Sequence, residues 1–306
     1  MDIGNAFLIV NPNARKGKGR EDGEKIVSYF REYGIDIPWR YTSAPGDAWK
    51  ITKDAIAEGC DTIIVAGGDG ALNEVVNGIM FSGREVRLGL VPIGRGNDYA
   101  FSLGIPGALY GALDVILSGK TRKVDVGLVE KDGGKGRYFL NGNGYGFEPM
   151  VNFRAMEYKH LNGIASYVVA FLEMMVHVPH AFKVEIELDG DVVELETQQI
   201  SFTLGKRMGS CFMLAPNASI DDGMFDFLAT KRPFGRLSLV SAVLKFLKGT
   251  HVDDKRNFLI KNVHSGVIRV SSGDIYSHAD GEVVALGEGK IFKVSIIERG
   301  LSMFSI

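Results

Sequence analysis

The sequence predicts two domains: an N-terminal α/β domain on a parallel sheet, followed by a mainly antiparallel β-sandwich. In the first part of the chain, short β-branched runs without polar alternation take turns with segments of helical spacing, which is typical of a parallel sheet with helices on both faces. From residue 123 onward, strand-length runs follow one another across Gly/Asp turns, which favours a sandwich. We expect domains at 1–124 and 125–306, and we allow the last strand to return to the first domain.

The first domain is expected to alternate strands and helices. The run TIIVA at 62–66 is β-branched and wholly apolar, as in a strand buried on both faces. From Leu72 onward, apolar residues recur at i, i+3, i+4 and i+7, which is one stripe of a helix. The other expected elements are strands at 6–10, 38–42 and 87–93 and helices at 21–33, 48–58 and 109–117.

The second domain is expected to consist mostly of strands. The strands at 123–130 and 137–141 flank KDGGKG, which is a hairpin signal. Further strands are expected at 182–188, 192–197, 199–205, 212–216, 224–230, 258–263, 266–270, 283–286 and 291–297, with helices at 164–177 and 236–248. The first of these helices is apolar on several sides, so it is either a core helix, which we favour, or an apolar wall for a greasy substrate.

The composition is that of an ordinary globular protein, with 45% hydrophobic and 24% charged residues among 306. A net charge of −2 argues against a nucleic-acid partner and limits attraction to anionic lipid to a local surface. The longest largely apolar stretch, 164–178, is shorter than the roughly 20 residues that span a bilayer. Cys60 and Cys211 lack metal-ligand spacing, which favours a reduced cytoplasmic compartment.

The segment GGDG at 67–70 is the most informative one for function. It lies between a buried strand and a helix, where glycines let a ligand approach the backbone and the helix N-terminus attracts an anion. A carboxylate at Asp69 would repel phosphate unless a cation lies between them, and Mg²⁺ held with a nucleotide removes this conflict. The alternative is a plain glycine-rich turn in which Asp69 caps the helix.

Three further loops follow parallel strands, after Val10, Thr42 and Ile93, and should converge with GGDG at the carboxyl edge of the sheet. The amides and cations of NPNARKGKG suit nucleotide phosphates or ribose, although a solvated basic loop explains them equally well. In PIGRGND, Asn97 can hydrogen-bond a base or a phosphate. Asp98 brings a second carboxylate close to Asp69, and paired acids beside a triphosphate are what Mg²⁺ coordination requires.

Other acidic segments are ambiguous from the residues alone. Asp125, in KVDVG, is either a third acid of this network or a polar strand residue. The segment SHADGEV, with Asp280 and Glu282, is explained by a hairpin turn, because Asp-Gly is a type I′ signal. The segment DDGMFD binds a hard cation through Asp221 or Asp222, or is a turn that needs no metal.

Taken together, these segments resemble the diacylglycerol kinase catalytic family. NPNARKGKG, GGDGALNEVVNG, PIGRGNDYA, KVDVG, NGNGYGFE, DDGMFDF and HADGEV occur in its order and approximate spacing, and the chain looks like the bacterial soluble YegS/DgkB-like lipid kinases over nearly its whole length. GGDG alone is shared with NAD kinases and phosphofructokinases, whose nucleotide-binding domain is similar. The resemblance implies ATP between an α/β domain of that kind and a β-sandwich, with γ-phosphoryl transfer to a lipid hydroxyl such as that of diacylglycerol.

The resemblance also implies roles for single residues. Asp69 is expected to be catalytic, and Asp280 or Glu282 to be the base that takes the acceptor proton. The expected metal ligands are Asp69, Asp98 and Asp125, linked by Mg²⁺ and water, and Asp221 or Asp222 in a structural metal loop. With the loop analysis, the expected nucleotide contacts are Asn11, Asn13, Lys16, Thr42, Gly67, Gly68, Gly70, Asn73, Glu74, Gly94, Arg95, Gly96 and Asn97.

Two positions depart from the family pattern: Ala71 stands where the family has a threonine after GGDG, and Arg95 where it has a threonine between glycines. Two hydroxyls for phosphate are missing, although Arg95 offers a bidentate charged donor. The alternatives left open are an NAD kinase-like enzyme and a nucleotide-binding regulator without catalysis. We expect a cytoplasmic protein of phospholipid metabolism that meets its lipid alcohol peripherally at the membrane. Its lipid head group and any homodimer are left open.

Overall fold

The computed structural model describes residues 3–158, 160–161, 163–176, 178 and 180–306. The chain forms two compact units. The first unit contains the chain up to Val124 together with the C-terminal residues Arg299–Ile306, and the second unit is Asp125–Glu298. The chain passes from one unit to the other within two strands, β5 (Thr121–Lys131) and β16 (Ile291–Phe304).

The first unit is built on a parallel sheet, as predicted. Its strands are β1 (Ala6–Val10), β2 (Trp39–Tyr41), β3 (Thr62–Gly67) and β4 (Arg87–Pro92), in the order β2-β1-β3-β4, and the end of β16 adds a further parallel strand beside β4. Every residue of β1 and β3 is buried. This burial on both faces explains why these strands are continuous apolar runs.

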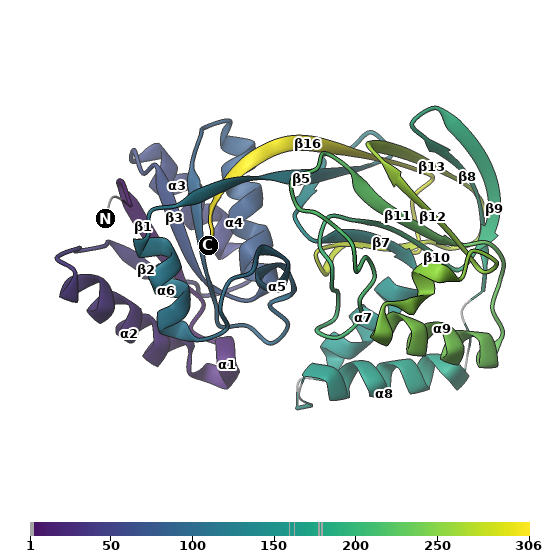
Figure 1. The fold of residues 1–306 in the computed structure, drawn as a ribbon, viewed down its shortest axis with the longest axis horizontal. Coiled ribbons are helices and arrows are strands. Elements are labelled where there is room, and N and C mark those ends of the chain that lie inside the picture. The colour runs from purple at the N-terminus through teal and green to yellow at the C-terminus, as the bar shows by residue number, and fades with distance from the viewer. Residues whose placement is uncertain (1–2, 159, 162, 177, 179) are drawn as a thin grey trace. The chain divides into compact units, whose positions relative to one another are not determined.

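Helices cover both faces of this sheet (Figure 1). They are α1 (Ala14–Gly17), α2 (Gly19–Glu32), α3 (Asp47–Ala57), α4 (Asp69–Ser82), α5 (Asp98–Leu103) and α6 (Leu109–Leu117). Helices α3 and α4 pack against each other, and α2 packs against α6. The helices predicted at 21–33, 48–58 and 109–117 are confirmed within two residues at each end, and the helix predicted from Leu72 onward begins at Asp69. The short α1 and α5 were not expected.

The second unit is an antiparallel sandwich, as predicted. One sheet has the order β12-β11-β10-β7-β14-β15, and in the other β13 lies between β16 and β8, with β9 beside β8 and β6 beside β5. The bounds are β6 (Arg137–Phe139), β7 (Gly142–Gly146), β8 (Phe182–Leu188), β9 (Asp191–Thr197), β10 (Gln199–Thr203), β11 (Phe225–Thr230), β12 (Phe258–Val263), β13 (Ser265–Ser272), β14 (Tyr276–Ala279) and β15 (Glu282–Leu286).

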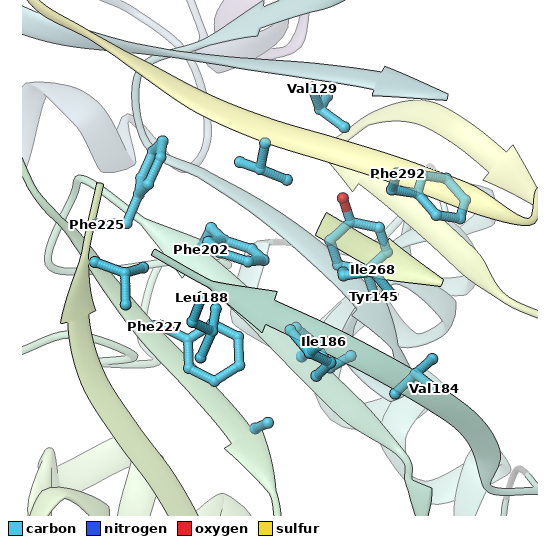
Figure 2. Packing of buried hydrophobic residues seen from close by; sticks show 14 of the residues in the cluster. Val129, Tyr145, Val184, Ile186, Leu188, Phe202, Phe225, Phe227, Ile268 and Phe292 are labelled. Atoms are coloured by element: carbon cyan, nitrogen blue, oxygen red, sulfur yellow. The ribbon is translucent and has the colours of Figure 1, made fainter. Parts of the chain in front are cut away.

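Aromatic side chains fill the space between the two sheets (Figure 2). Phe202 lies at the centre, with its ring centroid 5.8 Å from that of Phe225 and 5.0 Å from that of Phe227. Tyr145 and Phe292 form a second edge-on pair at 5.1 Å. Such edge-on pairs pack densely and bury large apolar areas, so this layer is the main source of stability of the unit.

Three helices cover the other face of the six-stranded sheet: α7 (Phe147–Glu157), α8 (Gly163–Val176) and α9 (Arg236–Lys248), with a 3-10 turn η1 (Thr250–Asp253) after α9. The alternation of side chains along β11 explains both layers, because Phe227 points into the sandwich core and Leu228 joins the cluster under α9. The central strands β7 and β10 of the six-stranded sheet are therefore buried on both faces.

The structure corrects three expectations. The strand predicted at 212–216 is wrong: Met208 and Phe212 exchange two backbone hydrogen bonds of 2.8 and 3.0 Å in a local bridge, and no ladder continues from it. Strands β7 and β14 were not predicted, since sequences such as GNGYG have low strand propensity and only pairing with neighbours makes them strands. Helix α7 was also missed, and His177 of the predicted helix 164–177 lies outside the described residues.

Candidate functional site

The four predicted loops of the first unit meet at one edge of the sheet. Their strands are parallel, and backbone hydrogen bonds join the residues just beyond the strand ends. The N–H of Asn11 donates to Ala66 at 2.9 Å, and that of Ile93 to Gly67 at 3.0 Å. The N–H of Thr42 donates to Val10 at 2.9 Å. The predicted convergence is confirmed.

Two glycines let the GGDG and GRGND loops touch through their backbones. A Cβ on Gly94 would lie 2.3 Å from the Cα of Gly68, which no real contact allows. The first intrahelical hydrogen bond of α4 runs from the N–H of Leu72 to the carbonyl of Gly68 at 3.0 Å. The N–H groups of the turn lie before Leu72 and are therefore not used in the hydrogen bonds of the helix itself. No side chain caps this 14-residue helix, and its N-terminus is therefore suited to an anion.

Asp69 ties these two loops together. Its Oδ1 accepts the backbone N–H of Asp98 at 2.8 Å and lies 3.4 Å from that of Tyr99. Asp69 thus caps the short helix α5 rather than its own helix, and it holds the GGDG turn against the GRGND loop. The two aspartates are neighbours, as predicted, and Asp98 is buried.

Three residues that were expected to contact the nucleotide, Asn73, Glu74 and Asn97, use their side chains in hydrogen bonds within the protein. Asn73 is fully buried and receives the amide N–H of Asn77 at 3.2 Å, which leaves it no exposed surface for a ligand. The carboxylate of Glu74 accepts the N–H groups of Gly46 and Ala48 at 2.7 and 2.9 Å, so it caps α3. The helix stripe did not reveal the role of Glu74, because its partners lie at the start of α3.

Asn97 also folds back onto its own loop. It has a left-handed backbone with φ of 51°, and its Oδ1 accepts the N–H of Gly94 at 2.9 Å. Its amide N–H groups lie 3.2 Å from the carbonyl oxygens of Pro92 and Gly94. The side chain therefore shapes the loop that was expected to bind the nucleotide.

The first loop is an ordered turn. Oδ1 of Asn11 accepts the N–H of Asn13 at 3.0 Å, and Arg15 pairs with the buried Asp22 at 3.1 Å. Arg15 and Lys16 both have left-handed backbones, and Lys16 stays exposed. Of the expected contacts here, Lys16 is the mobile cation best suited to reach a phosphate.

A second acidic site lies in the sandwich unit, at the turn between β14 and β15. Asp280 and Gly281 have φ of 51° and 87°, as in the type I′ hairpin expected from Asp-Gly. The Asp280 carboxylate accepts three backbone N–H groups, from Leu140 at 2.8 Å, Asn141 at 2.9 Å and Gly142 at 3.0 Å. Glu282 is only half-buried and lies 3.5 Å from Arg137.

A buried pair that sequence reasoning missed stands beside this turn. Nε2 of His278 lies 2.9 and 2.7 Å from the two carboxylate oxygens of Glu148. Burial lowers the pKa of His278, but the charges of Glu148, Asp280 and Glu282 outweigh it, so this pKa is raised. Two signals were available, since Glu148 comes two positions after the end of the glycine-rich strand β7 and His278 two positions before Asp280.

The DDG loop is joined to Asp125 within the same unit. Oδ2 of the buried Asp125 accepts the N–H of Gly223 at 2.8 Å. Asp222 accepts the N–H of Met224 at 3.1 Å, and Asp221 the hydroxyl of Ser219 at 3.0 Å. Across the described residues, no three His, Cys, Asp or Glu side chains gather as a metal-binding group, so the metal ligands stay predictions.

Asp226 makes the stability of the sandwich unit depend on pH. Burial, with the neighbouring charge of Asp222, raises the pKa of Asp226 from 3.8 to about 6. Its ionisation therefore costs stability, and this cost appears as the pH rises through about 6. We expect Asp226→Asn to raise the free energy of unfolding by about 2 to 3 kcal/mol at pH 8, and by almost nothing near pH 4. Urea unfolding at both pH values measures this, and an equal gain at both would contradict it.

An apolar pocket opens between the helices and the six-stranded sheet of this unit. Its lining includes Phe147, Val151, Phe171, Met208, Leu239 and Phe246. Glu148 stands at its wall, where its N–H donates to the side chain of Gln199 at 2.7 Å. Phe171 and Tyr167 of α8 line it too, and both also pack against a core cluster that contains the buried Ala170. The inner face of this helix is therefore part of the core, as favoured, and an apolar wall for a greasy substrate stays a prediction.

Comparison with known proteins decides the family. Residues 5–129 match the model of the diacylglycerol kinase catalytic domain, and residues 143–291 match that of the YegS C-terminal NAD kinase beta sandwich-like domain. A diacylglycerol kinase of Bacillus subtilis is 31% identical over 252 residues, which cover 82% of this chain and 81% of the relative. The chain belongs to the diacylglycerol kinase family.

A further relative agrees with this assignment, and two solved structures share the fold. A diacylglycerol kinase of Staphylococcus aureus is 32% identical over 74% of this chain and 70% of its own length. A crystal structure of a Bacillus anthracis diacylglycerol kinase superposes with a TM-score of 0.75 at 23% identity, covering 98% of this chain and 96% of the other. A yeast NADH kinase shares the fold, with a TM-score of 0.52 at 12% identity over 97% of this chain and 82% of its own.

Membership of the diacylglycerol kinase family confirms the predicted resemblance and the prediction that the chain is a kinase. It also explains why the predicted motifs span both units, since one family model covers each of them. Within the described residues, no helix combines the length and apolarity needed to cross a membrane.

Proposed function

We propose that this member of the diacylglycerol kinase family is an ATP- and Mg²⁺-dependent lipid kinase that transfers the γ-phosphoryl group to a lipid hydroxyl such as that of diacylglycerol. The observation that carries this proposal is the junction of the GGDG and GRGND loops through Asp69. It places the Asp69 carboxylate and the backbone of Asp98 at a glycine-lined helix N-terminus, and Mg²⁺ is commonly bound through one or two carboxylates plus substrate phosphates.

In this proposal the first unit binds the nucleotide. Gly67, Gly68 and Gly70 let the phosphates approach the α4 N-terminus, while Lys16 and Arg95 supply positive charge. Arg95 offers its guanidinium where the family has a threonine hydroxyl, which supports a rearranged phosphate contact. The remaining expected contacts, Asn11, Asn13, Thr42 and Gly96, lie on the same converging loops.

Mg²⁺ would be held by Asp69 and Asp98 of the first unit together with the nucleotide. In the second unit, Asp125 stays a predicted metal ligand, and Asp221 or Asp222 would belong to a separate structural site. When bound, the ion would neutralise charge on the phosphates. Asp69 and Asp98 are adjacent, and among the described residues no third His, Cys, Asp or Glu joins them as a metal-binding group. A metal site here would therefore need oxygen atoms of the nucleotide as further ligands. The role of the protein is then chiefly positioning and electrostatic stabilisation.

The second unit binds the lipid in this proposal. The apolar pocket under α7, α8 and α9 suits an acyl chain, and its wall reaches Glu148, beside the turn with the candidate base. Between the two candidates, Glu282 is the better base, because three backbone N–H groups already occupy the Asp280 carboxylate. Asp280 would then hold the turn in place.

A membrane-docking surface is available on two helices of this unit. We define it as Val168, Leu172 and Val176 on α8 and Leu237, Val240 and Leu244 on α9, all exposed, with Leu237 89% exposed. Arg236 donates to the carbonyl of Val176 at 2.9 Å and so links the two helices. Residues 231–252 contain Lys231, Arg232, Arg236, Lys245 and Lys248 and no acid, and of these Lys245 pairs with Asp254 just beyond them. This charge fits an anionic bilayer surface, which would place the pocket beside the lipid.

Acidic substitutions on this surface test the docking. We expect the double variant Leu237→Asp and Leu244→Asp to bind phosphatidylglycerol vesicles about tenfold or more weakly, because charge replaces apolar contact with lipid. Vesicle sedimentation measures this. The matched control is Val192→Asp with Leu286→Asp, two exposed apolar residues on strands β9 and β15. Equal loss of binding in both double variants would contradict the assignment.

Steady-state release of ADP tests the proposed reaction. With mixed micelles of diacylglycerol, release is expected to depend on both the lipid and Mg²⁺ and to stop when EDTA is added. Release that requires NAD instead of lipid would favour an NAD kinase-like enzyme. ATP binding in calorimetry without ADP release under any condition would favour a regulator without catalysis.

A further inference from the structure

The buried Glu148–His278 pair is not required by packing alone. The His278 side chain is 1% exposed and that of Glu148 20% exposed, and other buried polar side chains such as Asn143 and Ser277 lie next to the pair. Buried ionic pairs are weak sources of stability, because removing two charges from water costs about as much as their attraction returns. Gly144 makes room for them, since a Cβ there would lie 2.3 Å from Oε2 of Glu148. The fold therefore accommodates a pair that contributes little to its stability.

One end of the pair holds the turn that bears the candidate base. Nδ1 of His278 lies 3.0 Å from the N–H of Gly281, the residue between Asp280 and Glu282. An N–H donor at this nitrogen means that Nδ1 accepts and that the ring proton is on Nε2, facing Glu148. The imidazole is thus oriented from both sides, by a carboxylate on α7 and by the backbone of the turn.

The other end reaches the apolar pocket. Glu148 contributes to the pocket wall, while its carboxylate holds His278. The pair therefore forms a short chain of contacts from the pocket, through one carboxylate and one imidazole, to the backbone of the turn.

We propose that His278 and Glu148 are positioning residues that fix the turn Asp280–Glu282 and thereby orient Glu282 toward the lipid hydroxyl. This inference rests on the proposed function and extends it from the base to the residues that hold it. Protonation of His278 at Nδ1 removes the acceptor for Gly281, so the turn loses this bond in acid. The groups that face the ring are Glu148 from α7, Asp280 and Glu282 from the turn, and the ring of Phe153, which is nearly perpendicular to the imidazole.

Nitrogen-15 NMR of the imidazole tests the geometry without any need for activity. At pH 8 the expected signature is a hydrogen-free Nδ1 and a protonated Nε2, with the Gly281 amide resonance changing as His278 titrates. Glu148→Gln keeps a hydrogen-bond acceptor but removes the charge, so the titration should move to lower pH. A proton on Nδ1 at pH 8, or a Gly281 amide that ignores the titration, would overturn the proposal.

The pH profile of kcat tests the role in turnover. We expect His278→Gln to lower kcat about tenfold at pH 8, with KM for lipid and ATP within twofold of wild type, and to remove one ionisation from the acid limb. The matched control is Glu157→Gln at the far end of α7, which should behave as wild type. A His278→Gln profile like that of wild type would overturn the proposal. Should wild type phosphorylate no lipid, the proposed function fails, and the NMR result alone decides whether the pair holds the turn.

Discussion

Replacing Asp69 by Asn is expected to lower the turnover of lipid phosphorylation about 10²- to 10³-fold while the fold stays intact. The amide oxygen of Asn still accepts the N–H of Asp98, which Asp69 holds at 2.8 Å, so the junction of the two loops survives. Only the negative charge is lost, and with it the proposed contribution to Mg²⁺ binding. Kinetics with lipid micelles and thermal unfolding of the same sample measure both quantities.

One further variant separates the effect of the charge from that of the helix cap at Asp69, and a second variant elsewhere is the control. Asp69→Ala removes the cap of α5 as well, and should cost about 1 kcal/mol of stability in addition to the activity. Asp54→Asn changes an exposed aspartate on α3 and should alter neither. Full activity of Asp69→Asn would remove Asp69 from the proposed mechanism.

Replacing Glu282 by Gln is expected to lower kcat about 10²- to 10⁴-fold without lowering the melting temperature, since a positioned general base contributes that much. Its ion pair with Arg137 is half-exposed and contributes little to stability. Asp280→Asn should behave differently. An amide nitrogen cannot accept the N–H of Leu140, so one backbone donor loses its partner, at a cost of about 1 to 3 kcal/mol.

The two variants together identify the base. If Glu282 is the base, Glu282→Gln is folded and nearly inactive, while Asp280→Asn loses stability and activity together. A fully active Glu282→Gln beside a stable but inactive Asp280→Asn would assign the base to Asp280 instead. Measured kcat and melting temperatures of the two proteins distinguish these outcomes.

The sequence predicted the parts of the site that depend on local rules. A buried strand, a glycine turn and a helix form a unit that short-range patterns specify, and parallel pairing then brings the loops after Val10, Ala66 and Ile93 together. The Asp-Gly hairpin at Asp280 was predictable for the same reason.

The remaining features depend on contacts between distant residues. Glu74 caps a helix that begins 27 positions earlier in the chain, at Asp47, and no spacing rule links the two. His278 and Glu148 meet only because β14 pairs with the glycine-rich strand β7. The exposed stripe on α9 is visible only once its other face is known to lie on the sheet.

Product identification tests the central claim most directly. Wild-type protein is incubated with labelled ATP, Mg²⁺ and mixed micelles that carry diacylglycerol, phosphatidylglycerol, a sphingoid base or undecaprenol, and the products are identified by mass spectrometry. We predict one lipid with an added, labelled phosphate on its hydroxyl, absent from the Asp69→Asn sample. Bound ATP with no phosphorylated lipid from any member of the panel would contradict the account.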